Sequence, residues 1–105
     1  IQGLAEGLNF AKKKKLKIDS LIKVLSNGAG QSWQLENRSN TMWQNKFDFG
    51  FMNKLMLKDL KLVLNESKNS KIKLPETKRI KEYYKILVKR GFSEEDTSNL
   101  IRLLK

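Results

Sequence analysis

The stretch FDFGFMNKLMLKDLKLVL, residues 47–64, predicts one long helix that is apolar around most of its circumference. Successive residues turn about 100° around a helix axis. On that projection the apolar side chains fill a wide arc, and Lys54, Lys61 and Lys68 form a separate stripe that faces solvent. A helix with so wide an apolar arc is expected to lie at the centre of its domain.

Two charges interrupt the apolar side of this helix, which is expected to run from about Gly50 to Ser70 with Asp48 as a candidate N-cap. Lys58 falls at the edge of the apolar arc and Asp59 falls within it. An unpaired buried carboxylate costs several kcal/mol, so Asp59 needs a partner or an opening to water. Two interpretations stay open: a structural ion pair, or a face that borders a cleft completed by another domain.

The rest of the chain also follows the helical period of 3.6 residues. A first helix carries its apolar residues at Ile1, Leu4, Ala5, Leu8 and Ala11 and ends in a run of solvated lysines. Residues 20–26 form a second helix, with Asp19 as its expected N-cap. Residues 31–38 are expected to form a short helix or turn, and residues 39–50 a polar and aromatic connection.

The C-terminal third contains clear boundary signals. Pro75 is placed to begin a helix and Gly91 follows its end. Ser93 and Asp96 then resemble a capping cluster before a last short apolar helix. No segment alternates like a strand, so we predict one all-α domain over residues 1–105, with about five or six helices in a compact bundle.

Composition excludes several functions. The chain has no Cys and no His, which removes disulfides, cysteine metal sites and the commonest general base, so no metal site is expected. No apolar run approaches the ~20 residues of a membrane span, and we expect a cytoplasmic protein. The first residue, Ile1 instead of Met, suggests a fragment.

The net charge of +11 raises the alternative of a basic helical module that binds nucleic acid or another polyanion. The basic residues are spread through both halves of the chain, and lysines far outnumber arginines. Readers of nucleic-acid bases favour arginine and a clustered basic footprint. These features disfavour nucleic-acid binding and leave it as the second hypothesis. A third hypothesis is a helical interaction domain that dimerises through GFMNKLMLKDL, residues 50–60.

Several motifs together resemble one enzyme family. They are AEGLNFAKKKKLKIDSLIKVLSNG (5–28), GAGQSWQLENR (28–38), a Phe seven residues before KDL (58–60), and DTSNLI (96–101). The order and spacing are similar to those of the C-terminal domain of the β-hydroxyacid dehydrogenases, which include 3-hydroxyisobutyrate dehydrogenase and tartronate semialdehyde and glyoxylate–succinic semialdehyde reductases. The resemblance implies a fold like the C-terminal domain of 6-phosphogluconate dehydrogenase.

The resemblance also implies a two-domain oxidoreductase that uses NAD or NADP to interconvert a small 3-hydroxy acid and its semialdehyde. The Rossmann domain and the catalytic lysine of the family would precede Ile1, so no catalytic residue is expected here and the isolated chain should be inactive. Family members also suggest a homo-oligomer.

Site residues are carried over by the same resemblance. Lys58 corresponds to a cofactor contact of the family, and Phe51 to an active-site contact. Asp59 corresponds to the residue that supports this lysine and the cleft. Ser32, Trp33 and Asn37 are expected to shape the substrate side or the domain packing. For Trp33, simple burial in the core is the favoured alternative. Asp96 and Ser98 resemble a D-x-S pair of the family, although a helix N-cap explains them equally well.

Overall fold

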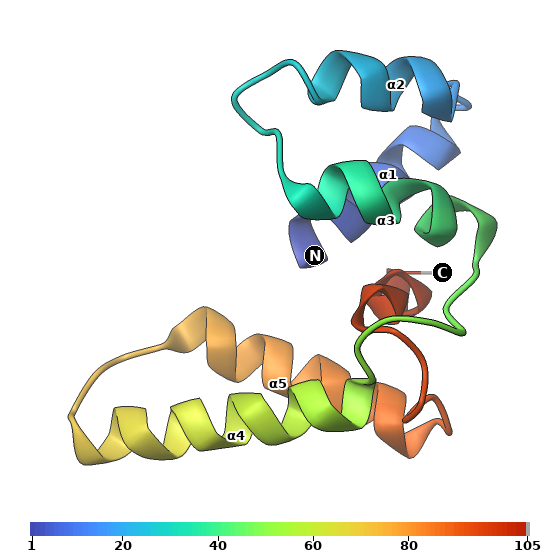
Figure 1. Cartoon of the computed structure of the whole chain (residues 1–105). Coiled ribbons are helices and arrows are strands. Elements are labelled where there is room, and N and C mark those ends of the chain that lie inside the picture. Colours follow the sequence, from blue (N-terminus) through green and yellow to red (C-terminus); the bar gives the residue numbers. More distant parts are fainter. Residues whose placement is uncertain (105) are drawn as a thin grey trace. The chain divides into compact units, whose positions relative to one another are not determined.

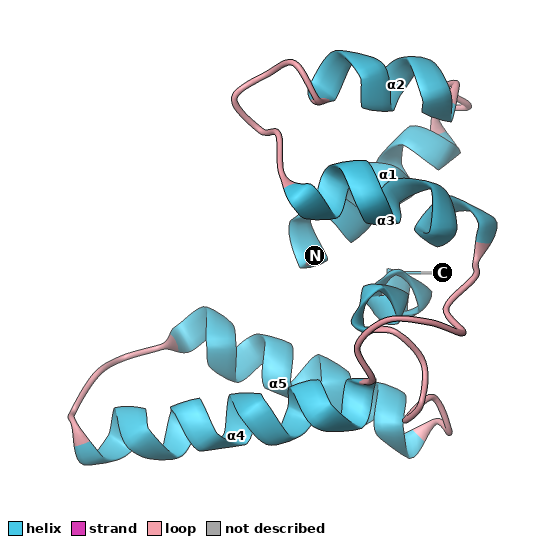
Figure 2. Cartoon of the chain, viewed as in Figure 1, coloured by secondary structure: helices cyan, strands magenta, loops and turns pink. Residues whose placement is uncertain are grey.

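The computed structural model describes residues 1–104, and every regular element in that range is a helix (Figures 1 and 2). Five α-helices and one 3₁₀-helix follow one another: α1 (Gln2–Lys13), α2 (Ile18–Leu25), α3 (Trp33–Gln44), α4 (Asn53–Asn69), α5 (Pro75–Lys89) and η1 (Thr97–Leu104). Within these residues the pairing of extended backbone is limited to an isolated bridge between Met52 and Asp96. The predicted all-α class and the predicted number of helices are confirmed.

The chain divides into two compact units, and each is described separately. Unit 1 contains Ile1–Phe47 and Ser98–Lys105, and unit 2 contains Asp48–Thr97. None of the helices in residues 1–104 is both long and apolar enough to cross a membrane.

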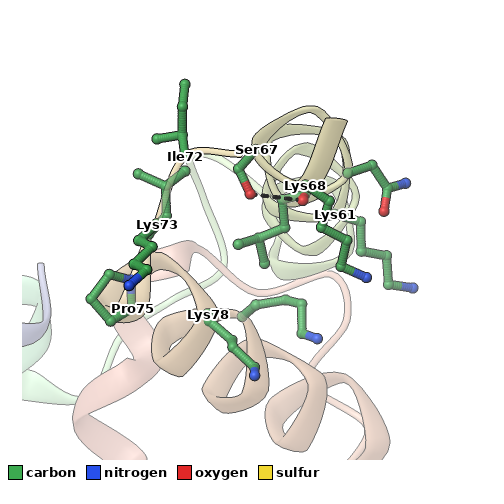
Figure 3. Close-up of a pocket in the computed structure, with 11 residues that line it drawn as sticks. Lys61, Ser67, Lys68, Ile72, Lys73, Pro75 and Lys78 are labelled. Atoms are coloured by element: carbon green, nitrogen blue, oxygen red, sulfur yellow. Dashed lines mark hydrogen bonds between the residues drawn. The ribbon is translucent and has the colours of Figure 1, made fainter. Parts of the chain in front are cut away.

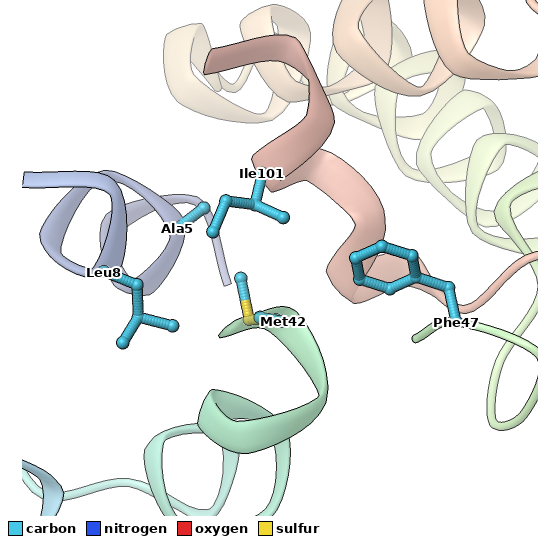
Figure 4. Close-up of a cluster of buried hydrophobic side chains, with 5 residues drawn as sticks. All are labelled: Ala5, Leu8, Met42, Phe47 and Ile101. Carbon is cyan, nitrogen blue, oxygen red and sulfur yellow. The ribbon is translucent and has the colours of Figure 1, made fainter. Parts of the chain in front are cut away.

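The core of unit 1 gathers side chains from α1, α3, the loop after α3 and η1. Figure 4 shows its members, which are Ala5, Leu8, Met42, Phe47 and Ile101. The guanidinium of Arg102 lies 4.9 Å from the centre of the Phe47 ring, so a cation covers one side of this aromatic residue. The apolar period predicted for the first helix is therefore confirmed, because Ala5, Leu8 and Ala11 are its buried residues.

Three local predictions were wrong. Helix α3 continues through residues 39–44, where a connection was expected, because Ser39 and Met42 are buried on the same face as Leu35. Asp19 lies inside the first turn of α2, whose N-cap is Lys17, and does not cap the helix. Likewise α4 begins after Met52 and not after Asp48.

In unit 2, α4 and α5 pack side by side and are joined by residues 70–74 (Figure 1). Pro75 is the first residue of α5 and Gly91 follows it with a φ of +89°, as the boundary signals predicted. Helix α5 buries Tyr84 and Leu87, and α4 buries Asn53, Leu57 and Ser67.

The prediction that α4 lies at the centre of its domain was wrong for this chain. Its buried residues occupy one side of the helix, and the opposite side leaves Leu62 and Val63 61% and 49% exposed. One neighbouring helix covers only part of so wide an apolar arc, because helix–helix packing buries a single stripe of each partner. We call the uncovered side, which carries Leu55, Lys58, Asp59, Leu62 and Val63, the open face of α4.

Candidate functional site

The segment before α4 is held by residues that come 45 positions later in the chain. The backbone N–H of Phe51 donates to Oδ2 of Asp96 at 2.9 Å, and the carbonyl of Phe51 accepts from the N–H of Thr97 at 2.9 Å. Asp96 and Thr97 are buried, whereas Phe51 remains partly open to solvent. The backbone of Phe51 is therefore fixed on both sides, and its ring is left available for contact.

The first turn of α4 is closed by the segment that follows α5. The N–H groups of Asn53 and Lys54 donate to the carbonyls of Glu95 and Ser93, at 2.9 and 3.1 Å. The side-chain amide of Asn53 donates to the carbonyl of Phe92 at 2.7 Å. The first N–H groups of a helix are otherwise free to bind anions. Here the first two are occupied, and the N–H groups of Leu55 and Met56 donate to the carbonyl of Met52, so an anion beside this helix must be met by side chains.

Lys58 and Asp59 form such a side-chain pair on the open face. Nζ of Lys58 lies 3.4 Å from Oδ1 of Asp59, and the two side chains are 63% and 49% exposed. The sequence argument required either a partner for Asp59 or access to water, and the structure provides both. An exposed ion pair of this kind adds little to stability. Both groups can therefore turn towards a ligand at small cost to the fold.

Phe51 stands two residues before α4, so helical spacing does not place it on the same face as Lys58. Its position comes instead from its backbone hydrogen bonds to Asp96 and Thr97. The seven-residue spacing of the motif therefore does not by itself place Phe51 against Lys58. The hydrogen bonds to Asp96 and Thr97 fix Phe51 just before the helix that carries Lys58.

Ser32, Trp33 and Asn37 lie in unit 1, at the start of α3. The hydroxyl of Ser32 caps the helix by accepting from the N–H of Leu35 at 3.0 Å. The side-chain amide of Asn37 donates to the carbonyl of Trp33 at 2.9 Å. Trp33 is 59% exposed, so the interpretation of Trp33 as a core residue was wrong. The guanidinium of Arg38 lies 4.9 Å from its ring centre.

Sequence reasoning missed the role of Asp96 and its surroundings. The polar run Asp96–Asn99 is buried throughout, and Asp96 is bonded to the entry of α4. Tyr84 lies at the same place and donates its hydroxyl to the carbonyl of Thr97 at 3.1 Å. Burial raises the pKa of the Tyr84 phenol, and the nearby Asp96 carboxylate adds to this effect. Four consecutive polar residues directly before the apolar pair Leu100 and Ile101 were the available signal, because buried polar side chains need specific partners.

The fold defines a class of protein through its similarity to solved structures. The chain matches 3-hydroxyisobutyrate dehydrogenase from Salmonella typhimurium with a TM-score of 0.84 and 25% identity, over 96% of this chain and 35% of that one. It also shares the fold of the Mycobacterium tuberculosis 3-hydroxyisobutyrate dehydrogenase, with a TM-score of 0.85 and 24% identity, over 98% of this chain and 38% of that one. The helices therefore correspond to a helical part of dehydrogenases.

The sequence comparison identifies the family. A family described as "NAD-binding of NADP-dependent 3-hydroxyisobutyrate dehydrogenase" matches residues 1–104, and the chain belongs to it. A Shewanella frigidimarina protein, named as an uncharacterized oxidoreductase, is 43% identical over the whole chain, which covers 36% of that protein. The L-threonate dehydrogenase of Pectobacterium atrosepticum is 27% identical over 99 residues, 94% of this chain and 33% of that protein. The chain spans about a third of the length of these curated relatives, and the resemblance seen in its motifs is confirmed.

Proposed function

We propose that this chain is the helical C-terminal domain of an NAD(P)-dependent β-hydroxyacid dehydrogenase and that α4 forms one wall of its cofactor cleft. The supporting observation is the combination at α4 of a fixed Phe51 backbone with an exposed Lys58–Asp59 pair. Family membership and the dehydrogenase names of the relatives support the class of reaction.

The residues at α4 fit the chemistry of a dinucleotide. The ammonium of Lys58 is exposed and can donate to phosphate or ribose oxygens, and the carboxylate of Asp59 can accept from a ribose hydroxyl. Phe51 offers a partly exposed apolar ring two residues before the helix that carries these polar groups. The bound cofactor supplies the hydride chemistry, and the protein supplies binding and orientation. In this proposal Lys58 binds the cofactor, Asp59 holds the ammonium, and Phe51 excludes water.

Ser32, Trp33 and Asn37 are proposed to act on the substrate side or in packing against another domain. The exposure of Trp33 supports this role, because its indole ring is available to a partner surface. Ser32 and Asn37 would act indirectly, since each holds the first turn of α3 that presents Trp33. The proposed substrate is a small hydroxy acid or its semialdehyde.

The remaining parts of the proposal concern the whole enzyme. The 105 residues contain no GxGxxG motif, so we propose that they are inactive without a dinucleotide-binding domain that holds the catalytic lysine. The open face of α4 supports a role in domain or subunit contacts, and we propose a cytoplasmic homo-oligomer.

The test measures cofactor affinity in the longer enzyme that contains this chain. Lys58→Ala should raise the dissociation constant for NADH or NADPH about tenfold, as expected for the loss of a charge-assisted contact of about 1.4 kcal/mol. Lys89→Ala is the matched control, because it removes an exposed lysine from the end of α5, outside the open face of α4. An unchanged dissociation constant in Lys58→Ala would contradict the proposed site.

A further inference from the structure

A hollow lies at the end of unit 2 where α4 is joined to α5. The C-terminal half of α4, the loop of residues 70–74 and the first turns of α5 enclose a pocket of about 520 Å³ (Figure 3). Small-molecule sites commonly have volumes of about 300–1,000 Å³. The pocket is separate from Phe51, Lys58 and Asp59, none of which lines it.

The shape of the pocket follows from the turn between the two helices. Lys71 adopts a φ of +55° after the end of α4, and the N–H of Ile72 then donates to the carbonyl of Ser67 at 2.8 Å. This turn directs the chain away from α4 before Pro75 begins α5. The space left between them is lined by aliphatic side chains, Leu64, Ile72, Leu74 and Pro75.

Five lysines from three different segments surround this aliphatic surface: Lys61 and Lys68 of α4, Lys73 of the loop, and Lys78 and Lys81 of α5 (Figure 3). Across residues 1–104, no acidic side chain lines the pocket. Lys81 pairs with Glu82 at 2.6 Å, and the charge of Lys78 also interacts with that carboxylate. Lys61, Lys68 and Lys73 make no ion pair with any residue that the structure describes. Like charges around one hollow repel one another, and a bound anion would relieve that repulsion.

The chemistry of the lining selects among anions. No aromatic ring lines the pocket within the described range, so it lacks the stacking surface that single-stranded nucleic acids use. Aliphatic side chains suit an alkyl or acyl chain, whose burial is favourable in proportion to its apolar area. Lysine ammonium groups are compact point charges and suit a carboxylate or phosphate without demanding a planar, two-pronged partner.

We propose that this pocket binds an amphipathic anion, a molecule with an aliphatic chain in the pocket and a phosphate or carboxylate head among the five lysines. A hollow of about 580 Å³ in unit 1 does not combine these two features. It is lined mainly by apolar and small residues of α1, α2 and the start of α3, and by no lysine.

Octyl phosphate, used below its micelle-forming concentration, tests the proposal on the 105-residue chain. Titration calorimetry should show binding at least tenfold tighter than that of octyl glucoside, which has the same alkyl chain, and than that of inorganic phosphate, which has no chain. Equal affinity for octyl glucoside would show that the lysines do not contribute to binding. Equal affinity for inorganic phosphate would show that the aliphatic lining does not contribute. Either result would overturn the proposal. Nonanoate, which has the same eight-carbon alkyl chain, in place of octyl phosphate then distinguishes a carboxylate head from a phosphate head.

Two pairs of variants locate the binding. Lys68→Gln with Lys78→Gln should weaken octyl phosphate about tenfold, because two ammonium contacts are lost. Lys13→Gln with Lys23→Gln reduces the net charge equally, lies in unit 1 outside the pocket, and should leave the affinity unchanged. Ile72→Ser should also weaken binding, whereas Phe10→Ser, in the hollow of unit 1, should not. Ile72 and Phe10 are both well exposed, so each variant is expected to fold.

Loss of affinity in the unit 1 variants to the same degree would show non-specific attraction to a basic surface and overturn the proposal. A short single-stranded DNA provides a further comparison. If it binds more tightly than octyl phosphate, and the Lys68 and Lys78 variants lose this binding, the lysines serve nucleic acid and the proposal is overturned.

Discussion

The carboxylate of Asp96 accepts a hydrogen bond from the backbone N–H of Phe51 at 2.9 Å and is fully buried in doing so. This contact joins the end of unit 2 to the entry of α4, and the return bond from Thr97 to the carbonyl of Phe51 completes it. A residue in the D-x-S motif thereby sets the backbone of the aromatic residue proposed to contact the cofactor.

Substitution of Asp96 should therefore destabilise the chain strongly. Asp96→Ala leaves a donor without its acceptor, and such a loss costs about 1–3 kcal/mol. Asp96→Asn keeps an oxygen acceptor and should recover part of the loss. Urea unfolding followed by circular dichroism measures the free energy of unfolding. Glu94→Ala is the control, because its ion pair with Lys54 is exposed and should contribute less than about 1 kcal/mol. Equal effects of Asp96→Ala and Glu94→Ala would contradict this role.

The Lys58–Asp59 pair should behave in the opposite way. Both side chains are exposed and lie 3.4 Å apart, so Lys58→Ala or Asp59→Ala should change the free energy of unfolding by less than about 1 kcal/mol. Thermal unfolding of the isolated chain checks this expectation. A small effect there assigns any loss of cofactor affinity in the longer enzyme to the site and not to the fold. A loss of several kcal/mol would instead make the pair structural.

Tyr84 should make the chain sensitive to alkaline pH. Burial raises its pKa above the ordinary value of about 10, so the folded state keeps the phenolic proton where the unfolded state releases it. Above about pH 10 the unfolded state binds fewer protons, and the free energy of unfolding falls by about 1 kcal/mol per pH unit from this group.

The comparison of wild type with Tyr84→Phe isolates that contribution, because all other titrating groups are common to both proteins. Tyr84→Phe should be less stable at neutral pH by about 1 kcal/mol, the usual contribution of one hydrogen bond, here that to the carbonyl of Thr97. The difference should shrink between pH 10 and pH 11. Tyr83→Phe, a neighbouring and less buried ring, is the control. A difference that stays constant with pH would refute the assignment.

Ser32 should stabilise α3 through its cap. Ser32→Ala removes the acceptor for the N–H of Leu35 and should cost about 1 kcal/mol, whereas Ser32→Asp restores an acceptor and should regain most of it. Denaturant unfolding of the three proteins provides the measurement. If Ser32→Ala leaves stability unchanged, the hydroxyl is not needed for the cap, and a direct contact with substrate becomes the better explanation of its place in the motif.

The sequence was sufficient to predict elements with strong local signals. Pro75 and Gly91 marked the limits of α5, and the apolar period of α1 identified its buried face. The prediction failed for α3, since residues 39–41 have weak helical preference and the burial of Ser39 and Met42 extends the helix. Tertiary packing decided that boundary, and local sequence does not report it.

In the candidate site, too, some features follow from the local sequence and others depend on tertiary contacts. The spacing of Phe51 and Lys58 was readable as a motif, but the reason that Phe51 is held in place lies at Asp96, 45 residues away. The sequence also predicted the wide apolar arc of α4 correctly. It did not predict that one side of this arc is exposed, because burial depends on how many neighbouring helices the chain supplies.

The open face of α4 has a consequence for handling the protein. Water must solvate Leu62 and Val63, so two copies gain free energy by covering these side chains with each other. The net charge of +11 opposes such encounters through mutual repulsion. Added salt weakens that repulsion, since its range falls to about 3 Å at 1 M. Colloidal stability of the isolated chain thus rests on low ionic strength, and concentrated salt favours self-association through this face.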